Sequence, residues 1–200
     1  MLDERVLGVL RRLEAETEAE ARLDLPFPEL SLQIEPTTGA LLFALVVGRP
    51  GCEVLEIGGS RGYSTIWLGA AARIHGGHVT SLEADPAKLD ALARNIAEAG
   101  LDEWIDVIGG DAFASLERLD GPFDLVFLDA WKEDYEPFFQ LARERIDTGG
   151  VIVADNVVSD ERLAAYSAAR QADPGLVSVT IPLDNGLEIT SVLTGWLLSD

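Results

Sequence analysis

From residue 53 onwards, short apolar stretches alternate with helical segments, and this alternation constrains the fold more than any other feature. The apolar stretches have the length of strands and are rich in Val, Ile and Leu. Expected strands cover residues 53–57, 78–82, 104–108, 123–128 and 150–154, and expected helices cover residues 63–74, 86–99, 112–119, 135–146 and 160–172. Repeated strand–helix units build a parallel sheet with helices on both faces.

The last two expected strands break this alternation. Residues 176–181 and 187–194 are separated only by residues 182–186, which are too few for a crossover helix. These two strands must therefore be antiparallel. We expect an α/β fold with a Rossmann-like, doubly wound sheet of about seven strands, mostly parallel with an antiparallel C-terminal strand.

Two helices are expected before the sheet begins. Apolar residues recur at helical spacing within residues 3–22, the prolines at 26 and 28 end that helix, and an apolar helix follows at residues 39–48. A chain of 200 residues suits one domain. We expect a single domain over residues 1–200, with residues 1–50 as a lid or dimer contact and residues 51–200 as a cofactor-binding core.

The composition excludes several classes of function. The net charge is −20 and the basic residues are scattered, so the surface should repel nucleic acid. Cys52 is the only cysteine, and no intrachain disulfide can form. The start of the chain lacks a signal-peptide pattern, and the most apolar run, residues 40–47, is shorter than the ~20 residues of a membrane helix. We expect a soluble cytoplasmic protein with no membrane contact.

The turn after the first core strand has the form Glu56-x-Gly58-x-x-x-Gly62. Ligands in open α/β sheets bind beyond the carboxyl ends of the strands, where glycines let the backbone approach them. Ser60 stands where the dinucleotide fingerprint needs its second glycine, and Glu56 suits a cationic ligand group better than a phosphate. Glu83 ends the second strand and can accept hydrogen bonds from ribose hydroxyls. The turn is therefore expected to hold a nucleoside-bearing cofactor.

Two further strand ends carry acidic residues. Asp129 and Lys132 follow the fourth strand, and Asp155 and Asn156 follow the fifth. Two carboxylates and an amide suit Mg²⁺, Mn²⁺ or Ca²⁺, and the absence of nearby histidine or cysteine argues against zinc. Lysine can lose its proton at accessible pH, whereas arginine effectively cannot, so Lys132 is a candidate general base. Each residue also has a structural alternative as a helix cap, a plain turn or a surface charge.

Residues 54–64 resemble the first motif of the class I S-adenosylmethionine-dependent methyltransferases, in the form found in small O-methyltransferases. Residues 109–112 resemble the adenine-side loop of that family. The resemblance implies that Glu56, Gly58 and Ser64 lie toward the methionine end of S-adenosylmethionine. It places Glu83 at the ribose and Asp111 at the adenine.

The pair Asp-x-x-Lys and Asp-Asn resembles the signature of the divalent-metal-dependent O-methyltransferases that act on catechol and caffeoyl-coenzyme A. The resemblance implies that Asp129, Asp155 and Asn156 hold the metal, most simply Mg²⁺. It makes Lys132 and Asp129 the catalytic residues, with Asp129 also near the cofactor. Ile34 lies where the N-terminal segment of the family crosses the cofactor. The resemblance also implies a homodimer.

Three features of the sequence leave the identity of the methyl acceptor undetermined. Residues 177–183 contain none of the acidic side chains that orient catechol in related enzymes, and Glu188 comes too late to be equated with one. Arg61 is bulkier than the usual residue of the first motif, and we expect it to point outward. Trp131 is expected either to line an aromatic pocket or to belong to the core.

The sequence thus predicts methyl transfer to a hydroxyl of a small catechol-like molecule. One alternative is methylation of a modified uridine hydroxyl in transfer RNA, which the net charge disfavours. Another is a non-catalytic cofactor-binding protein, which would not need Lys132 together with the acidic residues. A nicotinamide dehydrogenase is disfavoured by the glycine spacing.

Overall fold

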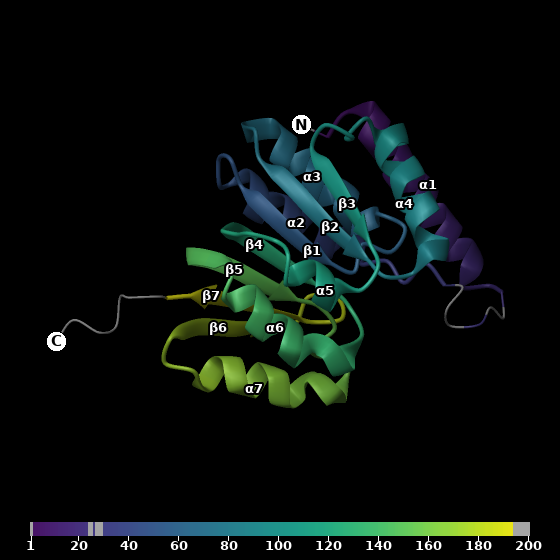
Figure 1. Ribbon diagram of the computed structural model, residues 1–200. Coiled ribbons are helices and arrows are strands. Elements are labelled where there is room, and N and C mark those ends of the chain that lie inside the picture. The colour runs from purple at the N-terminus through teal and green to yellow at the C-terminus, as the bar shows by residue number, and fades with distance from the viewer. Residues whose placement is uncertain (1, 24–25, 27–29, 194–200) are drawn as a thin grey trace.

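Seven strands form one sheet in the order β3-β2-β1-β4-β5-β7-β6 (Figure 1). The strands are β1 (Glu53–Ile57), β2 (His78–Glu83), β3 (Ile105–Gly109), β4 (Phe123–Leu128), β5 (Ile146–Ala154), β6 (Leu176–Ile181) and β7 (Leu187–Val192). Strand β7 is antiparallel to both of its neighbours, β5 and β6, while the other pairings are parallel. The expected sheet, with a reversed last strand, is confirmed.

The computed structural model describes residues 2–23, 26 and 30–193. Its helices are α1 (Glu4–Glu20), α2 (Pro36–Val47), α3 (Tyr63–His75), α4 (Pro86–Ala99), α5 (Ala112–Leu116), α6 (Tyr135–Arg143) and α7 (Ala164–Ala172), with 3-10 turns η2 (Lys132–Asp134) and η3 (Glu161–Leu163). Of the predicted break at residues 25–28, only Pro26 is described, and the predicted end of the last strand at Thr194 lies outside the described residues.

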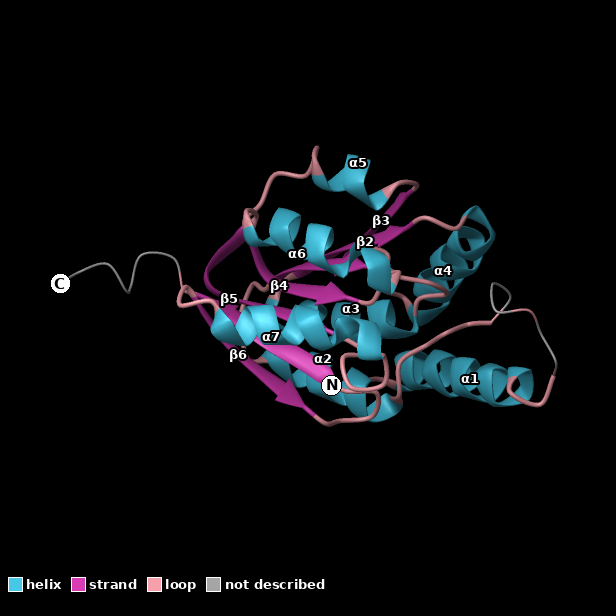
Figure 2. Cartoon of the chain, turned by 90° about the horizontal axis from the view of Figure 1, so that it is seen from below, coloured by secondary structure: helices cyan, strands magenta, loops and turns pink. Residues whose placement is uncertain are grey.

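Helices cover both faces of the sheet, as Figure 2 shows. One core contains buried residues of α1, α2, α3 and α4 with side chains such as Val54 and Phe127 from the adjoining face of the sheet. The other contains residues of α6 and α7 with side chains such as Leu55 and Val126. Neighbouring residues of one strand enter different cores because strand side chains alternate between faces. Strands buried on both faces explain the near-continuous apolar runs of the sequence.

The sequence-based prediction was wrong at the boundary between α6 and β5. We expected a helix to residue 146 and a strand from residue 150, but α6 ends at Arg143 and β5 begins at Ile146. The sequence Asp147-Thr148-Gly149-Gly150 has the composition of a turn. In the structure these residues belong to β5, because Ile146 pairs with Phe123; the register shifts before Val151 pairs with Leu125, and Gly149 takes φ +81° within this irregularity.

The loops that follow the central strands continue the hydrogen bonding of the sheet. The amide of Gly58 donates to Leu82, that of Asp129 donates to Ile57, and that of Asp155 donates to Leu128. The chain order reverses between β1 and β4, which makes this the switch point where open α/β sheets bind ligands. The glycine turn after β1 and the acidic residues after β4 and β5 therefore lie on either side of the same switch point.

The N-terminal helices pack on the same face as α3 and α4. Val6, Val9, Leu10 and Leu13 of α1 are buried in the core, and α2 packs along α3. Their use as a lid or dimer contact remains a prediction. No helix in the described part of the chain is long and apolar enough to span a membrane.

Candidate active site

The glycine turn requires glycine at its centre. Gly58 has φ +104° and Gly62 has φ +95°, conformations that residues with a Cβ rarely adopt. A Cβ built on Gly58 would lie 2.2 Å from the carbonyl oxygen of Asp129. The missing side chain therefore lets the turn after β1 pack directly against the end of β4.

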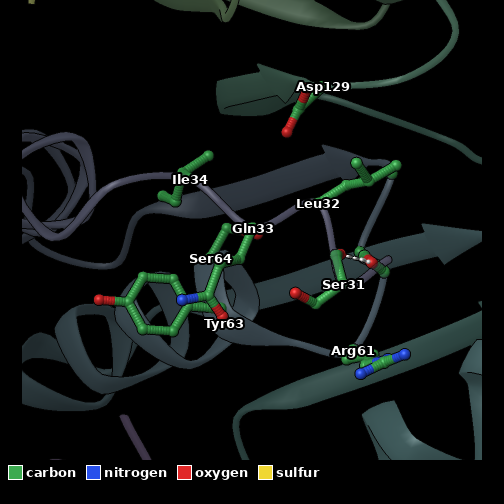
Figure 3. A pocket seen from close by; sticks show the side chains of 11 residues that line it. Ser31, Leu32, Gln33, Ile34, Arg61, Tyr63, Ser64 and Asp129 are labelled. Atoms are coloured by element: carbon green, nitrogen blue, oxygen red, sulfur yellow. Dashed lines mark hydrogen bonds between the residues drawn. The ribbon is translucent and has the colours of Figure 1, made fainter. Parts of the chain in front are cut away.

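A small hollow, partly open to solvent, lies beside this turn (Figure 3). The segment Ser31–Ile34 runs across it from the N-terminal side, and Asp129 stands at its far end (Figure 3). The lining residues are Ser31, Leu32, Gln33, Ile34, Gly58, Gly59, Ser60, Arg61, Tyr63, Ser64 and Asp129. Four of the seven predicted cofactor residues, Ile34, Gly58, Ser64 and Asp129, thus share one hollow.

Glu56 lies beneath the turn and does not line the hollow. Its side chain is fully buried and accepts hydrogen bonds from Thr65 Oγ1 and Ser81 Oγ, both at 2.5 Å. Burial raises the pKa of Glu56 to about 7, although hydrogen bonds from Ser64, Ser81 and Thr65 oppose the shift. Among the described residues, its Oε1 has no hydrogen-bond partner. Direct contact of Glu56 with the cofactor remains a prediction.

Glu83 and Asp111 lie at the ends of the next two strands and also outside the hollow's lining. The Glu83 carboxylate is nearly buried and accepts hydrogen bonds from the amides of Ser60 at 2.6 Å and Asp85 at 2.7 Å. Asp111 caps α5 by accepting from the amide of Phe113 at 2.8 Å. Each carboxylate has further acceptor positions for a ligand. Their ribose and adenine contacts remain predictions.

The acidic residues and the lysine meet at one place. Asp129 Oδ1 accepts hydrogen bonds from Lys132 Nζ at 3.0 Å and from Asn156 Nδ2 at 2.9 Å. Asp155 is 3% exposed, and burial, followed by the charge of Asp129, raises its pKa to about 7. Loops after two neighbouring strands bring these groups together, as the sequence predicted.

The donor set fits a divalent cation on two observations. Two carboxylates that repel each other lose that repulsion when a cation binds between them. In the part of the chain that the structure describes, Asp155 Oδ1 is buried without a hydrogen-bond partner. No group of three or more His, Cys, Asp or Glu side chains suited to a metal occurs among the described residues, so Asn156 would have to supply the third ligand through its amide oxygen.

Tyr135 was not predicted as a site residue. Its hydroxyl accepts a hydrogen bond from Lys132 Nζ at 2.9 Å and donates one to the carbonyl of Asp155 at 3.0 Å. Burial holds the pKa of Tyr135 well above its ordinary value, so the phenol stays protonated. The spacing Lys132-x-x-Tyr135, one turn of helix, was the signal available in the sequence.

The open questions about single residues are partly answered by the structure. Trp131 is 62% exposed, so it does not belong to the core. Glu188 is fully buried and accepts hydrogen bonds from Ser178 Oγ and Thr180 Oγ1. Its side chain therefore belongs to a polar cluster formed by the neighbouring strands β6 and β7. Arg61 does not simply point outward, because it forms an ion pair with Glu20 at the end of α1.

Comparison with known proteins agrees with this arrangement. Residues 55–157, which include the glycine turn and the acidic residues, match the family described as a methyltransferase domain. The chain is 33% identical to a catechol O-methyltransferase of Mycobacterium tuberculosis, over 98% of this chain and 89% of the relative. It is 34% identical to a catechol O-methyltransferase of Niastella koreensis, over 82% of this chain and 73% of the relative.

The fold has a close counterpart among solved structures. An O-methyltransferase of Bacillus cereus in complex with S-adenosylhomocysteine superposes with a TM-score of 0.78 at 28% identity, over 92% of this chain and 90% of that chain. The family match, the relatives and the shared fold lead to one conclusion. The chain belongs to the class I S-adenosylmethionine-dependent O-methyltransferases, in the catechol and caffeoyl-coenzyme A O-methyltransferase-like family.

Proposed function

We propose that this O-methyltransferase methylates one hydroxyl of a small vicinal diphenol in a reaction that requires a divalent cation. The observation that carries the proposal is the meeting of Asp129, Asp155, Asn156 and Lys132 beside the glycine turn. A plain turn or helix cap would not need Asp129 bonded to both Lys132 and Asn156, with the buried carboxylate of Asp155 close enough to feel the charge of Asp129. The relatives named as catechol O-methyltransferases support the choice of acceptor.

The cofactor would occupy the hollow at the switch point of the sheet. Gly58 and Ser64 would approach its methionine end, Glu83 its ribose and Asp111 its adenine, with Ile34 across it. When bound, S-adenosylmethionine supplies the methyl group on a positively charged sulfur. Glu56 would place a carboxylate beneath that end of the site, where a cationic ligand favours its ionised form.

Asp129, Asp155 and Asn156 would hold the cation, and their hard oxygen donors favour Mg²⁺. A bound divalent cation favours the ionised form of a hydroxyl at neutral pH. This matters because a free phenol has a pKa of about 10. Two neighbouring hydroxyls on one ring offer two oxygens, which suits a site whose protein ligands leave positions open.

Lys132 would remove the proton from the attacking hydroxyl. Its Nζ is held at 3.0 Å from Asp129 Oδ1 and 2.9 Å from Tyr135 Oη. A neutral amine that donates its two hydrogens to these oxygens keeps its lone pair for the substrate proton. The remaining contribution of the protein is to place the attacking oxygen in line with the methyl carbon and sulfur.

The acceptor would be a small aromatic molecule. Trp131, exposed between Asp129 and Lys132, offers an aromatic face to a ring bound at this edge. The net charge of −20 argues against transfer RNA as acceptor, since a phosphate backbone would be repelled.

A panel of acceptors tests the proposal. Purified protein with S-adenosylmethionine and Mg²⁺ should methylate catechol, while resorcinol, whose hydroxyls are not adjacent, and phenol should react at least roughly a hundredfold more slowly. Transfer RNA purified from cells, which carries modified uridines, tests the alternative acceptor in the same assay. Equal rates on catechol and resorcinol, or reaction only with RNA, would rule out a chelated diphenol.

A further inference from the structure

Asp184 makes a helix cap from a distant part of the chain. It lies in the turn between β6 and β7, in residues 182–186, and has φ +53°, an unusual conformation for a residue with a side chain. Its carboxylate accepts hydrogen bonds from Thr37 Oγ1 at 2.6 Å, from Thr38 Oγ1 at 2.7 Å and from the Thr38 amide at 3.1 Å. Glu35, the residue before α2, makes no capping bond with its own side chain. The start of α2 is therefore fixed from 146 residues away.

The start of α2 is also the end of the segment that crosses the cofactor hollow. Ser31–Ile34 leads directly into this helix. At its other end the segment is held by Ser31, whose amide donates to Glu20 Oε2 at 2.9 Å and whose carbonyl accepts from Ser60 Oγ at 2.6 Å. Hydrogen bonds thus hold the crossing segment at its start, through Ser31, and at its end, through the first turn of α2. Asp184 accepts the bonds at the second of these ends, from the C-terminal half of the protein.

The same turn also holds the loop that follows Asp155 and Asn156. The amide of Val157 donates to the carbonyl of Gly186 at 3.0 Å, and the amides of Val158 and Ser159 donate to the carbonyl of Asn185 at 3.1 and 2.9 Å. Packing is close enough that a Cβ on Gly186 would lie 2.7 Å from the backbone nitrogen of Val158. One short turn therefore contacts both the start of α2, into which the crossing segment leads, and the loop that follows Asp155 and Asn156.

We propose that Asp184 is a positioning residue that couples the cofactor site to the acceptor site. Its carboxylate fixes the start of α2, and with it the crossing segment, relative to the turn that holds residues 157–159. Breaking these hydrogen bonds should disturb both sites together, although the Asp184 side chain bonds to none of the three predicted metal ligands. The expected effect on the acceptor site rests on the proposed function, whereas the hydrogen bonds of Asp184 with α2 are a property of the fold.

The test uses Asp184→Asn and, from the other side of the same contact, the double variant Thr37→Val with Thr38→Val. Asparagine keeps the shape but loses the charge that attracts the helix N-terminus, and valine removes the hydroxyl donors. Asp173→Asn is the matched control, because Asp173 also sits in a turn next to β6 and accepts bonds from Gly175 and Arg143, at the opposite end of that strand.

Three measurements distinguish coupling from a simple helix cap. Both variants should speed amide hydrogen exchange in residues 31–38 and also in residues 156–159. They should weaken S-adenosylhomocysteine binding about fivefold. They should also raise the KM for catechol more than they lower kcat. Combining the variants should add little, since they break one contact. The control should change neither segment.

Faster exchange confined to residues 31–38, with residues 156–159 and the catechol KM unchanged, would reduce Asp184 to a helix cap and overturn the proposal. Additive effects of the two variants would overturn it as well. Hydrogen exchange and S-adenosylhomocysteine binding need no acceptor. Failure to methylate any diphenol would therefore contradict the proposed function, while these two measurements would still show whether Asp184 couples the two segments.

Discussion

Lys132 is the residue whose chemistry the proposed reaction depends on most directly. Its replacement by alanine should lower the rate of methyl transfer about 10²- to 10⁴-fold, the usual contribution of a general base. Binding of S-adenosylhomocysteine, measured by calorimetry, should stay nearly unchanged, because Lys132 does not line the cofactor hollow. Lys88→Ala is the control, since Lys88 lies on α4 and is the only other lysine. A large loss of cofactor binding would mean that Lys132 serves the cofactor instead.

Glu56 should make the ligand-free protein more stable in mild acid than above neutrality. Burial raises its pKa to about 7 in the folded state, against an ordinary value of 4.5, so folding favours the protonated form. The stability it contributes is present below about pH 4.5 and is lost as the pH rises through about 7. In Glu56→Gln, urea unfolding between pH 5 and pH 8 should lack a pH-dependent loss on the order of 2 kcal/mol. Parallel pH profiles for the two proteins would contradict this account.

Single residues were predictable where they follow directly from a strand end. Asp129, Asp155 and Asn156 could be placed together because parallel strands end at the same edge. Tyr135 and Asp184 could not, because their roles depend on tertiary contacts between segments far apart in the chain. Glu56 was identified as important, but the sequence could not reveal that three hydroxyls enclose it beneath the turn.

At the scale of elements, the glycine turn joins the two halves of the site. Gly58→Ala should lower the free energy of unfolding by about 2–4 kcal/mol, because the new Cβ would meet the Asp129 carbonyl at 2.2 Å in a left-handed conformation. Affinity for S-adenosylhomocysteine should fall about tenfold or more, since the turn or the end of β4 must shift. Chemical denaturation and calorimetry measure the two effects.

Gly76→Ala is the matched control for that substitution. Gly76 has φ +72°, but apart from its neighbours in the chain no atom of the described residues lies within 4 Å of a Cβ built there. It should show only the conformational cost of about 1 kcal/mol and no change in ligand affinity. If both glycine variants behave alike, the contact between Gly58 and Asp129 has no special importance.

The order and type of the elements could be predicted because strand and helix patterns alternate clearly along residues 53–172. Boundaries were less predictable where composition and pairing disagree, as in β5, whose glycine-containing start is kept extended by the neighbouring strand. The segment Ser31–Ile34 has no regular structure. Its place across the hollow follows from ties to Glu20, Ser60 and, through α2, Asp184, which no local pattern encodes.

At the scale of the whole molecule, the sheet order brings two chemistries to one place. The glycine turn follows β1 and the acidic residues follow β4 and β5. These three strands are neighbours in the sheet, although α3, α4 and α5 lie between β1 and β4 in sequence and α6 lies between β4 and β5. The turn between the antiparallel strands β6 and β7 contacts the start of α2 and the loop that follows Asp155 and Asn156. The fold thus places a candidate cofactor hollow and a candidate cation site side by side, and Asp129 belongs to both.

The most direct test of the central claim is the rate of methyl transfer to catechol as Mg²⁺ is returned to chelator-treated enzyme. The account predicts activity near zero without the cation and a saturable recovery as Mg²⁺ is added. In Asp155→Asn, which removes the carboxylate whose Oδ1 has no partner among the described residues, the recovery should shift to much higher Mg²⁺. Full activity in excess chelator would show that Asp129, Asp155 and Asn156 hold no catalytic metal.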